Sequence, residues 1–495
     1  MKTRVSGFAL DRRGNFSIIA AIAAVPLVMV VGMALDLASI TRKKSDLQQA
    51  TDAAGLAIVR EGKHITDQEA YLIAKRFLDG TLTTPYTNLK VTRNGTQFTV
   101  QADIDGGTQF GSLFGYKKWP VTAKSTADIA YASYEVALVL DTTGSMKGGK
   151  LAAMKDATLG LIESMAAQVN DEDKLKFALV PFANFVNVGA GYGPKFDSKG
   201  KQIAGTGAAW LDLYGQSDLP QSEFTKDASR FQIYANLGQE WRGCVETRYA
   251  DGNGFDVGDQ PATTADSRTL YVPAFAIDEP DTGYANSYIV SDAKPHDNTV
   301  QQKKKRWDKY GVATDASGNP KNNGLLDPLV VGLGNLIGNS GPGNNNGKKT
   351  IAIDTSISGG LPKGPGRGCD MQPITPLTND YAGLKAKVNQ LNAAGTTNIT
   401  EGVAWGTRVI SPGEPFNEGK DKKTTGIEKI MIVLTDGSNV FGNNSTELGS
   451  SYASNGYLID GRIGLTIGSS SDTNAKMNAR TLAACDVAKA AGTEI

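Results

Sequence analysis

Three oxygen-bearing side chains alternate along the chain directly after an apolar run. The run Ala137–Leu140 leads into Asp141, and Thr143 and Ser145 follow at every second position. A short apolar run predicts a buried strand, and open parallel sheets bind ligands where such strands end. Because the three groups leave the strand on one loop, we expect their side chains to face one centre. The chemistry open to them is metal coordination, phosphate binding or nucleophilic attack by the aspartate.

Two later turns carry groups of the same kind. Thr397 stands in AGTTNITEG and Asp436 in VLTDGSN, each beside a predicted sheet element. The chain has 3 cysteines and 2 histidines, without the paired short spacings of a zinc site. Two carboxylates and three hydroxyls, with a water or a partner completing six ligands, suit Mg²⁺ or Mn²⁺. The predicted metal ligands are Asp141, Thr143, Ser145, Thr397 and Asp436.

Two phosphate chemistries compete with the metal site at the same loop. Gly144–Lys150 has the G-x-x-x-x-G-K spacing of a phosphate-binding loop, but Leu151 stands where a Ser or Thr must bind Mg²⁺. Lys150 is then expected at the surface, at the start of a helix. The other chemistry is phosphoryl transfer with Asp141 as the nucleophile, because DTTGS is close to the DKTGT of P-type ATPases and carboxylates form acyl phosphates. A single membrane span cannot build a cation pump, so we expect a protein that is not an enzyme and keep phosphoryl transfer as the alternative.

The C-terminal part of the chain alternates strand and helix patterns. Glu135–Asp141 reads as a buried strand, Lys150–Val169 as an amphipathic helix and Leu175–Ala183 as another buried strand, which is typical of a parallel sheet. From about 188 to 376 the chain is rich in Gly, Asn, Asp and aromatic residues, with few periodic segments, and this indicates a large insertion. We predict an α/β fold with a mostly parallel sheet over 134–495.

The amino-terminal part contains one long apolar run. Phe16–Leu35 has no charged residue over 20 positions, and as a helix it spans about 30 Å, the thickness of a hydrocarbon core. We predict a cytoplasmic amino end at 1–15, a transmembrane helix at 16–35 and a helical extension at 36–62. Alternating apolar and polar residues then predict a small β-rich region at 63–133.

Charge and cysteine content bear on orientation and partners. Four basic residues precede the span and three follow it closely, so the positive-inside rule favours a cytoplasmic amino end and an extracytoplasmic C-terminal part. Cys244, Cys369 and Cys485 in that part fit an oxidising compartment. Cys244 and Cys369 flank a long irregular segment and could close it, but the pairing stays open. With 51 basic and 51 acidic residues, the chain offers no electrostatic case for nucleic acid.

The amino-terminal segment also resembles a known family. RRGNFSIIAAIAAVPLVMVVGMALDL and QQATDAAGLA combine a basic pair, a Gly-Asn, one membrane helix that ends in an Asp, and a further helix. Over residues 12–59 this is similar to the amino-terminal segment of TadE/TadG-type proteins of Tad (Flp) pilus assembly. Ile19 stands where pilin-like members carry a Glu, which argues against cleavage by a prepilin peptidase. The resemblance implies a single-pass protein of the bacterial inner membrane that works with pilus or secretion-apparatus components.

The five predicted ligands resemble a second family. Asp141-Thr-Thr143-Gly-Ser145, Thr397 and Asp436 are similar to the metal-ion-dependent adhesion site (MIDAS) of von Willebrand factor A (vWA) domains, with Thr143 in place of a Ser. This implies a doubly wound, mostly parallel, Rossmann-like domain over 134–495 that binds a protein partner whose acidic side chain reaches the metal. The family places a further strand and helix after the last predicted helix, so we expect these C-terminal elements to be missing.

Together the two resemblances predict a TadG-like, membrane-anchored vWA protein. Its expected function is assembly or anchoring of a Tad/Flp-type pilus in the bacterial envelope through divalent-metal-dependent protein contact. The vWA domain is expected in the periplasm. Besides phosphoryl transfer, a surface adhesin unrelated to pili is the other alternative.

Overall fold

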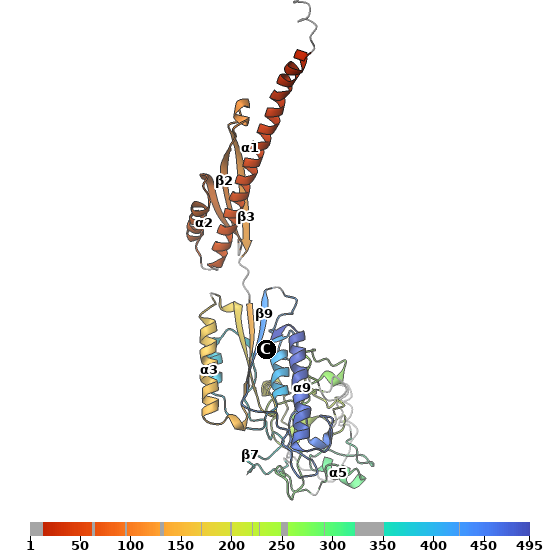
Figure 1. The fold of residues 1–495 in the computed structure, drawn as a ribbon. Helices are drawn as coiled ribbons and strands as arrows, with labels where there is room; N and C mark the ends of the chain where they lie inside the picture. The colour runs from red at the N-terminus through yellow and green to blue at the C-terminus, as the bar shows by residue number, and fades with distance from the viewer. Residues whose placement is uncertain are drawn as a thin grey trace, which may run out of the picture. The chain divides into compact units, whose positions relative to one another are not determined.

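The computed structural model of the protein contains two compact units, residues 1–131 and 132–495 (Figure 1). Each unit has its own hydrophobic core. The predicted cytoplasmic end up to residue 12 and the insertion segment with the run GLGNLIGNSGPGNNNGKK lie outside the described residues. The structure describes residues 13–61, 65–94, 97–128, 133–169, 171–198, 200–219, 221–226, 228–248, 256–291, 293–321, 351–424 and 426–495, with side chains from residue 19 onward.

The first unit is a three-stranded sheet covered by helices. Its strands pair antiparallel in the order β1-β2-β3. Alternate side chains of β2 are buried, as the period of a strand with one covered face requires, and they meet small apolar side chains of two helices. The elements are α1 (Arg13–Arg60), α2 (Asp67–Thr81), β1 (Tyr86–Asn94), β2 (Gln97–Gly107), the short 3₁₀ helix η1 (Gly111–Phe114) and β3 (Lys118–Asp128).

The helix α1 has two halves with different surroundings. Its C-terminal half buries Leu47, Ala50, Ala54 and Ile58 against the sheet and α2. Its N-terminal half leaves nearly all of its described apolar side chains exposed. Within the described residues, α1 is the one helix that is long and apolar enough to cross a membrane. The apolar half therefore fits a single-pass membrane anchor.

The second unit is built on a five-stranded mixed sheet in the order β10-β9-β4-β5-β8. Four strands run parallel, and the edge strand β8 pairs antiparallel with β5. The first strand of this unit, β4, lies in the middle of the sheet, and later strands are added on both sides of it, as in doubly wound folds. The predicted mixed α/β class is therefore confirmed. The strands are β4 (Ser133–Asp141), β5 (Leu175–Phe182), β8 (Thr375–Thr378), β9 (Ile427–Leu434) and β10 (Thr493–Glu494).

Helices cover both faces of this sheet (Figure 1). Val136, Leu138 and Leu140 of β4 point to one face and pack against apolar residues of α3 and α7. Ala137 and Val139 point to the opposite face and pack in the core with α8 and α9. This alternation follows from the period of a strand that is covered on both sides. The helices are α3 (Gly149–Ala166), α7 (Tyr381–Asn389), α8 (Ile399–Ile410) and α9 (Ser470–Ala490).

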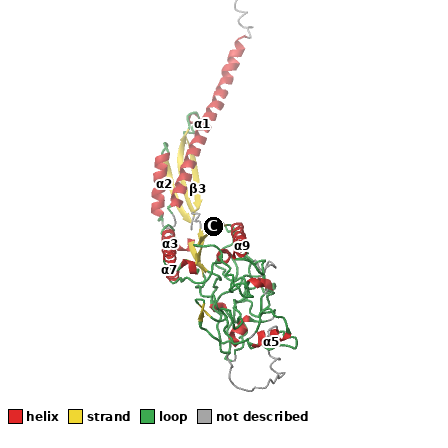
Figure 2. Cartoon of the chain, turned by 60° about the horizontal axis from the view of Figure 1, so that its bottom comes forward, coloured by secondary structure: helices red, strands yellow, loops and turns green. Residues whose placement is uncertain are grey.

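The long segment between β5 and β8 corresponds to the predicted insertion, and its described part consists mostly of loops (Figure 2). Its aromatic residues, among them Trp210, Tyr271 and Phe275, belong to the same core as α8 and one face of the sheet. A disulfide joins Cys244 to Cys369 across a separation of 125 residues. The short elements of the segment are η4 (Ala190–Tyr192), α4 (Arg230–Asn236), η5 (Ser267–Thr269), α5 (Val300–Asp308), β6 (Ile357–Ser358) and β7 (Leu361–Pro362).

The chain continues beyond α9 into a short strand. Thr493 and Glu494 form β10 and pair in parallel with Lys429 and Ile430 of β9. The last helix thus ends at Ala490, and a fifth strand follows it where the sequence led us to expect none. The remaining 3₁₀ turns are η2 (Gly144–Met146), η3 (Glu172–Lys174) and η6 (Leu458–Asp460).

Candidate functional site

The candidate site lies where two neighbouring parallel strands end. β4 ends at Asp141, and β9 ends at Leu434, two residues before Asp436. From β4 the sheet is built outward through β5 on one side and through β9 on the other. This is the topological switch point at which open α/β sheets form a crevice for ligands. The strand order therefore brings together loops that are far apart in the sequence.

Asp141 is fully buried at the end of β4. Its Oδ1 accepts a hydrogen bond of 2.8 Å from the backbone N–H of Thr143, and its Oδ2 accepts one of 2.6 Å from the hydroxyl of Thr435. Thr435 belongs to the loop after β9, so the carboxylate joins the two loops. Each carboxylate oxygen thus accepts one hydrogen bond and has a lone pair left for another donor or a cation.

Ser145, Asp436 and Lys150 form a chain of polar contacts beside Asp141. The hydroxyls of Thr143 and Ser145 lie 2.9 Å apart, and the Ser145 hydroxyl donates to Oδ1 of Asp436 at 2.8 Å. The Lys150 ammonium, from the first turn of α3, forms an ion pair of 2.5 Å with Oδ2 of Asp436. The hydrogen bond from Lys150, and then the one from Ser145, lower the pKa of Asp436 below its usual value. This carboxylate is therefore charged at neutral pH.

Thr397 comes from a third loop, which precedes α8. The backbone N–H of Gly144 donates to the carbonyl of Gly395 at 3.0 Å, so this loop is tied to the loop after β4. A Cβ added at Gly437 would lie 3.9 Å from Oγ of Ser145 and 3.9 Å from Oγ1 of Thr397. Both hydroxyls thus lie near the same glycine, which places the loop of Thr397 beside the other two loops.

The five residues predicted from the sequence therefore lie on three loops that meet at one edge of the sheet. Sequence reasoning missed Thr435, which fixes Asp141, and it assigned Lys150 to the surface. The Lys150 side chain is indeed 61% exposed, but its ammonium lies on a carboxylate of the site. The signal for this contact was the position of Lys150 at the start of the helix that follows the loop, since such a residue stays close to the loop that it leaves.

The donor set suits a hard divalent cation. Its members are oxygens only, from two carboxylates and three hydroxyls, the kind of ligand that Mg²⁺ and Mn²⁺ take. The Lys150 ammonium already lies on Asp436, so a metal at this carboxylate would compete with that ammonium. In the described ranges, no group of three or more His, Cys, Asp and Glu side chains could hold a metal. A metal at this centre would therefore depend on hydroxyl ligands as well as on Asp141 and Asp436.

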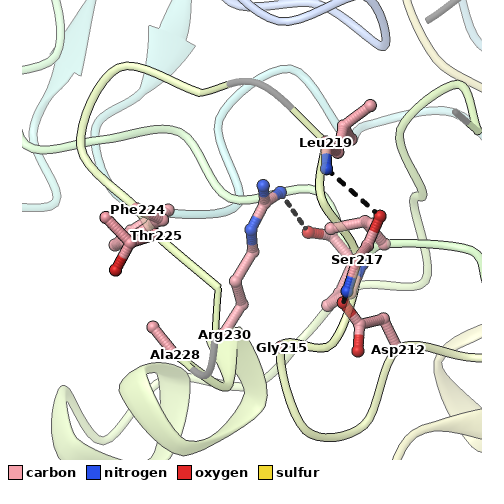
Figure 3. A pocket seen from close by; sticks show the side chains of 10 residues that line it. Asp212, Gly215, Ser217, Leu219, Phe224, Thr225, Ala228 and Arg230 are labelled. Atoms are coloured by element: carbon pink, nitrogen blue, oxygen red, sulfur yellow. Dashed lines mark hydrogen bonds between the residues drawn. The ribbon is translucent and has the colours of Figure 1, made fainter. Parts of the chain in front are cut away.

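A separate hollow lies in the insertion (Figure 3). Burial raises the pKa of Asp212, although its carboxylate accepts hydrogen bonds from the backbone N–H groups of Gln216 and Ser217. Arg230 forms a buried ion pair of 2.7 Å with Glu246. These charged groups are satisfied within the protein, which indicates a structural role. The hollow is lined by Asp212, Gly215, Ser217, Leu219, Phe224, Thr225, Ala228, Arg230, Val272 and Pro273.

Fold and site together define a class: a doubly wound α/β domain with oxygen donors at the switch point of its sheet, in one chain with a long apolar helix. Comparison with protein families adds one match. Residues 14–58 match the family described as putative Flp pilus-assembly TadE/G-like. The match covers the apolar half of α1 and most of the half that packs on the sheet. Comparison with curated proteins finds no match.

Two of the solved structures with some similarity are pilus proteins. One is the three N-terminal domains of the type V pili tip protein Mfa5 from Porphyromonas gingivalis, at 13% identity and a TM-score of 0.12, covering 21% of this chain and 18% of that one. Another is the pilus adhesin SpaC from Lactobacillus rhamnosus GG in an open conformation, at 14% identity and a TM-score of 0.11, covering 48% of this chain and 24% of that one. The chain thus spans a quarter or less of these proteins, and the scores are too low to support an argument about fold.

Proposed function

We propose that the protein is a membrane-anchored component of Tad/Flp pilus assembly whose α/β unit binds a protein partner in a divalent-metal-dependent manner. The pilus part is supported by the family match over residues 14–58 and by the exposed apolar half of α1. The proposed compartment is the bacterial inner membrane, with the α/β unit in the periplasm. The Cys244–Cys369 disulfide supports this placement, because disulfides persist in oxidising compartments.

One observation carries the proposed mode of contact. Oxygen donors from three loops converge at the switch point of the sheet, and a cationic group already lies on one of them. The residues that would hold Mg²⁺ or Mn²⁺ are Asp141, Thr143, Ser145, Thr397 and Asp436. When bound, the cation would supply an open coordination position for an acidic side chain of the partner. If the five strands of this sheet are numbered in chain order from β4, their order across the sheet is 3-2-1-4-5. This order and the three converging loops support the resemblance to vWA domains with a MIDAS.

The proposal favours a non-enzymatic role. Asp141 is fully buried, and both of its carboxylate oxygens accept hydrogen bonds. In-line attack needs room for a whole phosphoryl group beside the carboxylate, whereas a single cation needs only a remaining lone pair of a buried oxygen, so this setting speaks against an acyl phosphate on Asp141. The protein is therefore proposed to act by binding.

The experiment is replacement of the gene by site variants in the organism that encodes the protein. Ser145→Ala removes one donor of the site, and Asp436→Asn removes a charge. Both variants are expected to reach the membrane at the wild-type level and to leave cells with few or no pili in electron micrographs. Ser164→Ala, an exposed serine on α3, is the matched control and should leave the pili unchanged.

Three results would contradict the proposal. Normal pili in both site variants would show that the site is not needed for pilus assembly. Normal pili together with lost surface adherence would favour an adhesin unrelated to pili. Incorporation of phosphate from ATP into the wild-type protein, lost in Asp141→Asn, would favour the phosphoryl-transfer enzyme.

A further inference from the structure

A loop of the first unit exposes several large apolar side chains together. It comprises residues 110–119 and is called the aromatic loop below. Leu113 is 77% exposed, Phe114 50%, Tyr116 66% and Trp119 56%. It lies between β2 and β3, includes η1, and ends with Lys118 and Trp119, the first two residues of β3. An exposed apolar patch of this density marks a surface that meets a partner or a membrane.

The aromatic loop has a fixed shape. The N–H of Tyr116 donates to the carbonyl of Gly111 at 3.0 Å, and the hydroxyl of Thr108 donates to the carbonyl of Tyr116. Gly115 has a φ of 88°, in the left-handed region that glycine adopts without strain. The loop therefore presents its apolar side chains on a closed turn.

The same loop is tied to α1 at the point where the charge-free run ends. One carboxylate, that of Asp36, accepts backbone hydrogen bonds from Gln109, Phe110 and Gly111 at 2.7–2.9 Å. A Cβ at Gly32, one helical turn earlier, would overlap the ring of Phe110. Gly32 and Asp36 are also the two buried positions in this stretch of the helix. Figure 1 shows η1 beside α1 on the side of its apolar half.

This attachment sets the depth of the loop along the anchor helix. Asp36 is the first charged residue after the apolar run 16–35. With a rise of 1.5 Å per residue, Gly32 lies about 6 Å from Asp36 toward the middle of the run. If the run fills the hydrocarbon core, then the Phe110 ring lies at its boundary, and the aromatic loop lies at the level of the lipid headgroups.

We propose that the aromatic loop is a second membrane contact, which inserts Leu113, Phe114, Tyr116 and Trp119 into the interface of the bilayer leaflet that faces the folded units. This inference rests on the proposed role of α1 as a membrane anchor. Tyr and Trp favour this level of a bilayer because their rings are apolar and their polar atoms stay hydrated. The exposed Lys117, next in the chain, suits the headgroups. The function of Asp36 is then to hold the loop at the membrane surface.

Tryptophan fluorescence tests this contact in the full-length protein. The chain has 5 tryptophans, and Trp210, Trp241, Trp307 and Trp405 are at most 7% exposed in the core of the second unit. Trp119 is therefore the residue that brominated lipid can quench. In proteoliposomes of acyl-brominated phosphatidylcholine, we expect quenching of the part of the tryptophan emission that comes from Trp119. This part is the difference between the wild type and Trp119→Phe. Vesicles of the unbrominated lipid should retain it.

Two variants sharpen the test. Asp36→Asn weakens the attachment and is expected to reduce the lipid quenching. A tryptophan placed by Leu72→Trp in the Trp119→Phe background lies on α2 at a site of similar exposure, 48% in the wild type. This tryptophan should not be quenched by lipid, because α2 packs on the half of α1 beyond the apolar run.

Flotation after an alkaline wash separates failure of the anchor from failure of the loop. Protein that floats with the vesicles while Trp119 escapes lipid quenching would overturn the loop contact and leave the anchor intact. If iodide cannot reach Trp119 in that case, a second copy or another protein covers the loop. Protein that does not float would overturn both, since no bilayer would lie beside the loop.

Discussion

Replacement of Lys150 by Gln should strengthen divalent metal binding. The ammonium of Lys150 lies 2.5 Å from Oδ2 of Asp436, so it competes with any cation for that carboxylate. Gln removes the charge and keeps most of the length of the side chain. The expected direction is opposite to that of most substitutions at a binding site, which makes the test informative.

The size of the effect follows from charge and distance. A divalent cation bound to Asp436 would lie roughly 5 Å from the ammonium, which costs about 1.7 kcal/mol in a water-like dielectric and about half of that at physiological salt. If the cation instead displaces the ammonium, loss of the exposed ion pair costs about 0.2–1 kcal/mol. In either case the cost is at most about 1 kcal/mol, so Lys150→Gln should bind the cation up to roughly 5-fold more tightly.

The assay is titration of Mn²⁺ into the full-length protein in nanodiscs, followed by electron paramagnetic resonance of the free ion. Lys155→Gln is the matched control, because Lys155 lies farther along α3 and donates to the carbonyl of Asn389. This control should change the affinity little. Equal or weaker Mn²⁺ binding in Lys150→Gln would refute the view that the ammonium competes with a metal.

Three further predictions concern pH, the disulfide and a buried ion pair. The pKa of Asp436 is lowered, so the contribution of its charge to stability is complete above the usual pKa of an aspartate and is lost as pH falls through the lowered value. Mn²⁺ binding should follow the same course when it is titrated from pH 7 downward. Loss of binding already near pH 6 would contradict this prediction. Reduction of the Cys244–Cys369 disulfide should destabilise the second unit by up to about 5 kcal/mol, because the disulfide limits the entropy of the unfolded segment that it closes. Thermal unfolding with and without reductant measures this effect, with Cys485→Ser as the control. Equal melting temperatures would refute the prediction. Lys429→Ala should lower the free energy of unfolding, measured with denaturant, by about 3–5 kcal/mol, because it leaves its partner Glu135, at 2.6 Å, buried without a countercharge. A loss below about 1 kcal/mol would show instead that water reaches this carboxylate.

The parts of the site that lie directly after strands could be predicted from the sequence. Asp141 and Asp436 each follow an apolar run, and parallel strands end at the same edge of a sheet. The helix start placed Lys150 near the loop after β4, but its pairing with Asp436 could not be predicted, because the two residues are 286 positions apart and their approach depends on the rotation of α3. The choice of Cys369 as partner of Cys244 likewise needed the folded chain, since three cysteines allow three pairs.

The fold was predictable where the hydrophobic period was regular. The helix α2 was missed, although Thr66 and Glu69 form a capping box, whose spacing can be read in the sequence. The edge strand β8 has four residues, of which two are buried, too few for a period to appear. The core of the insertion was not predictable either. Its aromatic side chains come from loops without a period, and their packing is set by the sheet and α8.

The attachment of Asp36 to the aromatic loop illustrates the same limit. The sequence shows a charged residue at the end of an apolar run, and this alone indicates where the span ends. The three backbone donors come from a hairpin more than 70 residues later. Only the packing of that hairpin on α1 reveals that the carboxylate holds a loop in place.

The central claim is that a divalent cation binds among Asp141, Thr143, Ser145, Thr397 and Asp436. Anomalous diffraction at the manganese edge, from crystals of the full-length protein grown with Mn²⁺, tests it most directly. We predict one strong anomalous peak among the oxygens of these side chains, with the Lys150 ammonium displaced from Asp436. Absence of a peak at saturating Mn²⁺, with Lys150 still paired to Asp436, would contradict the claim.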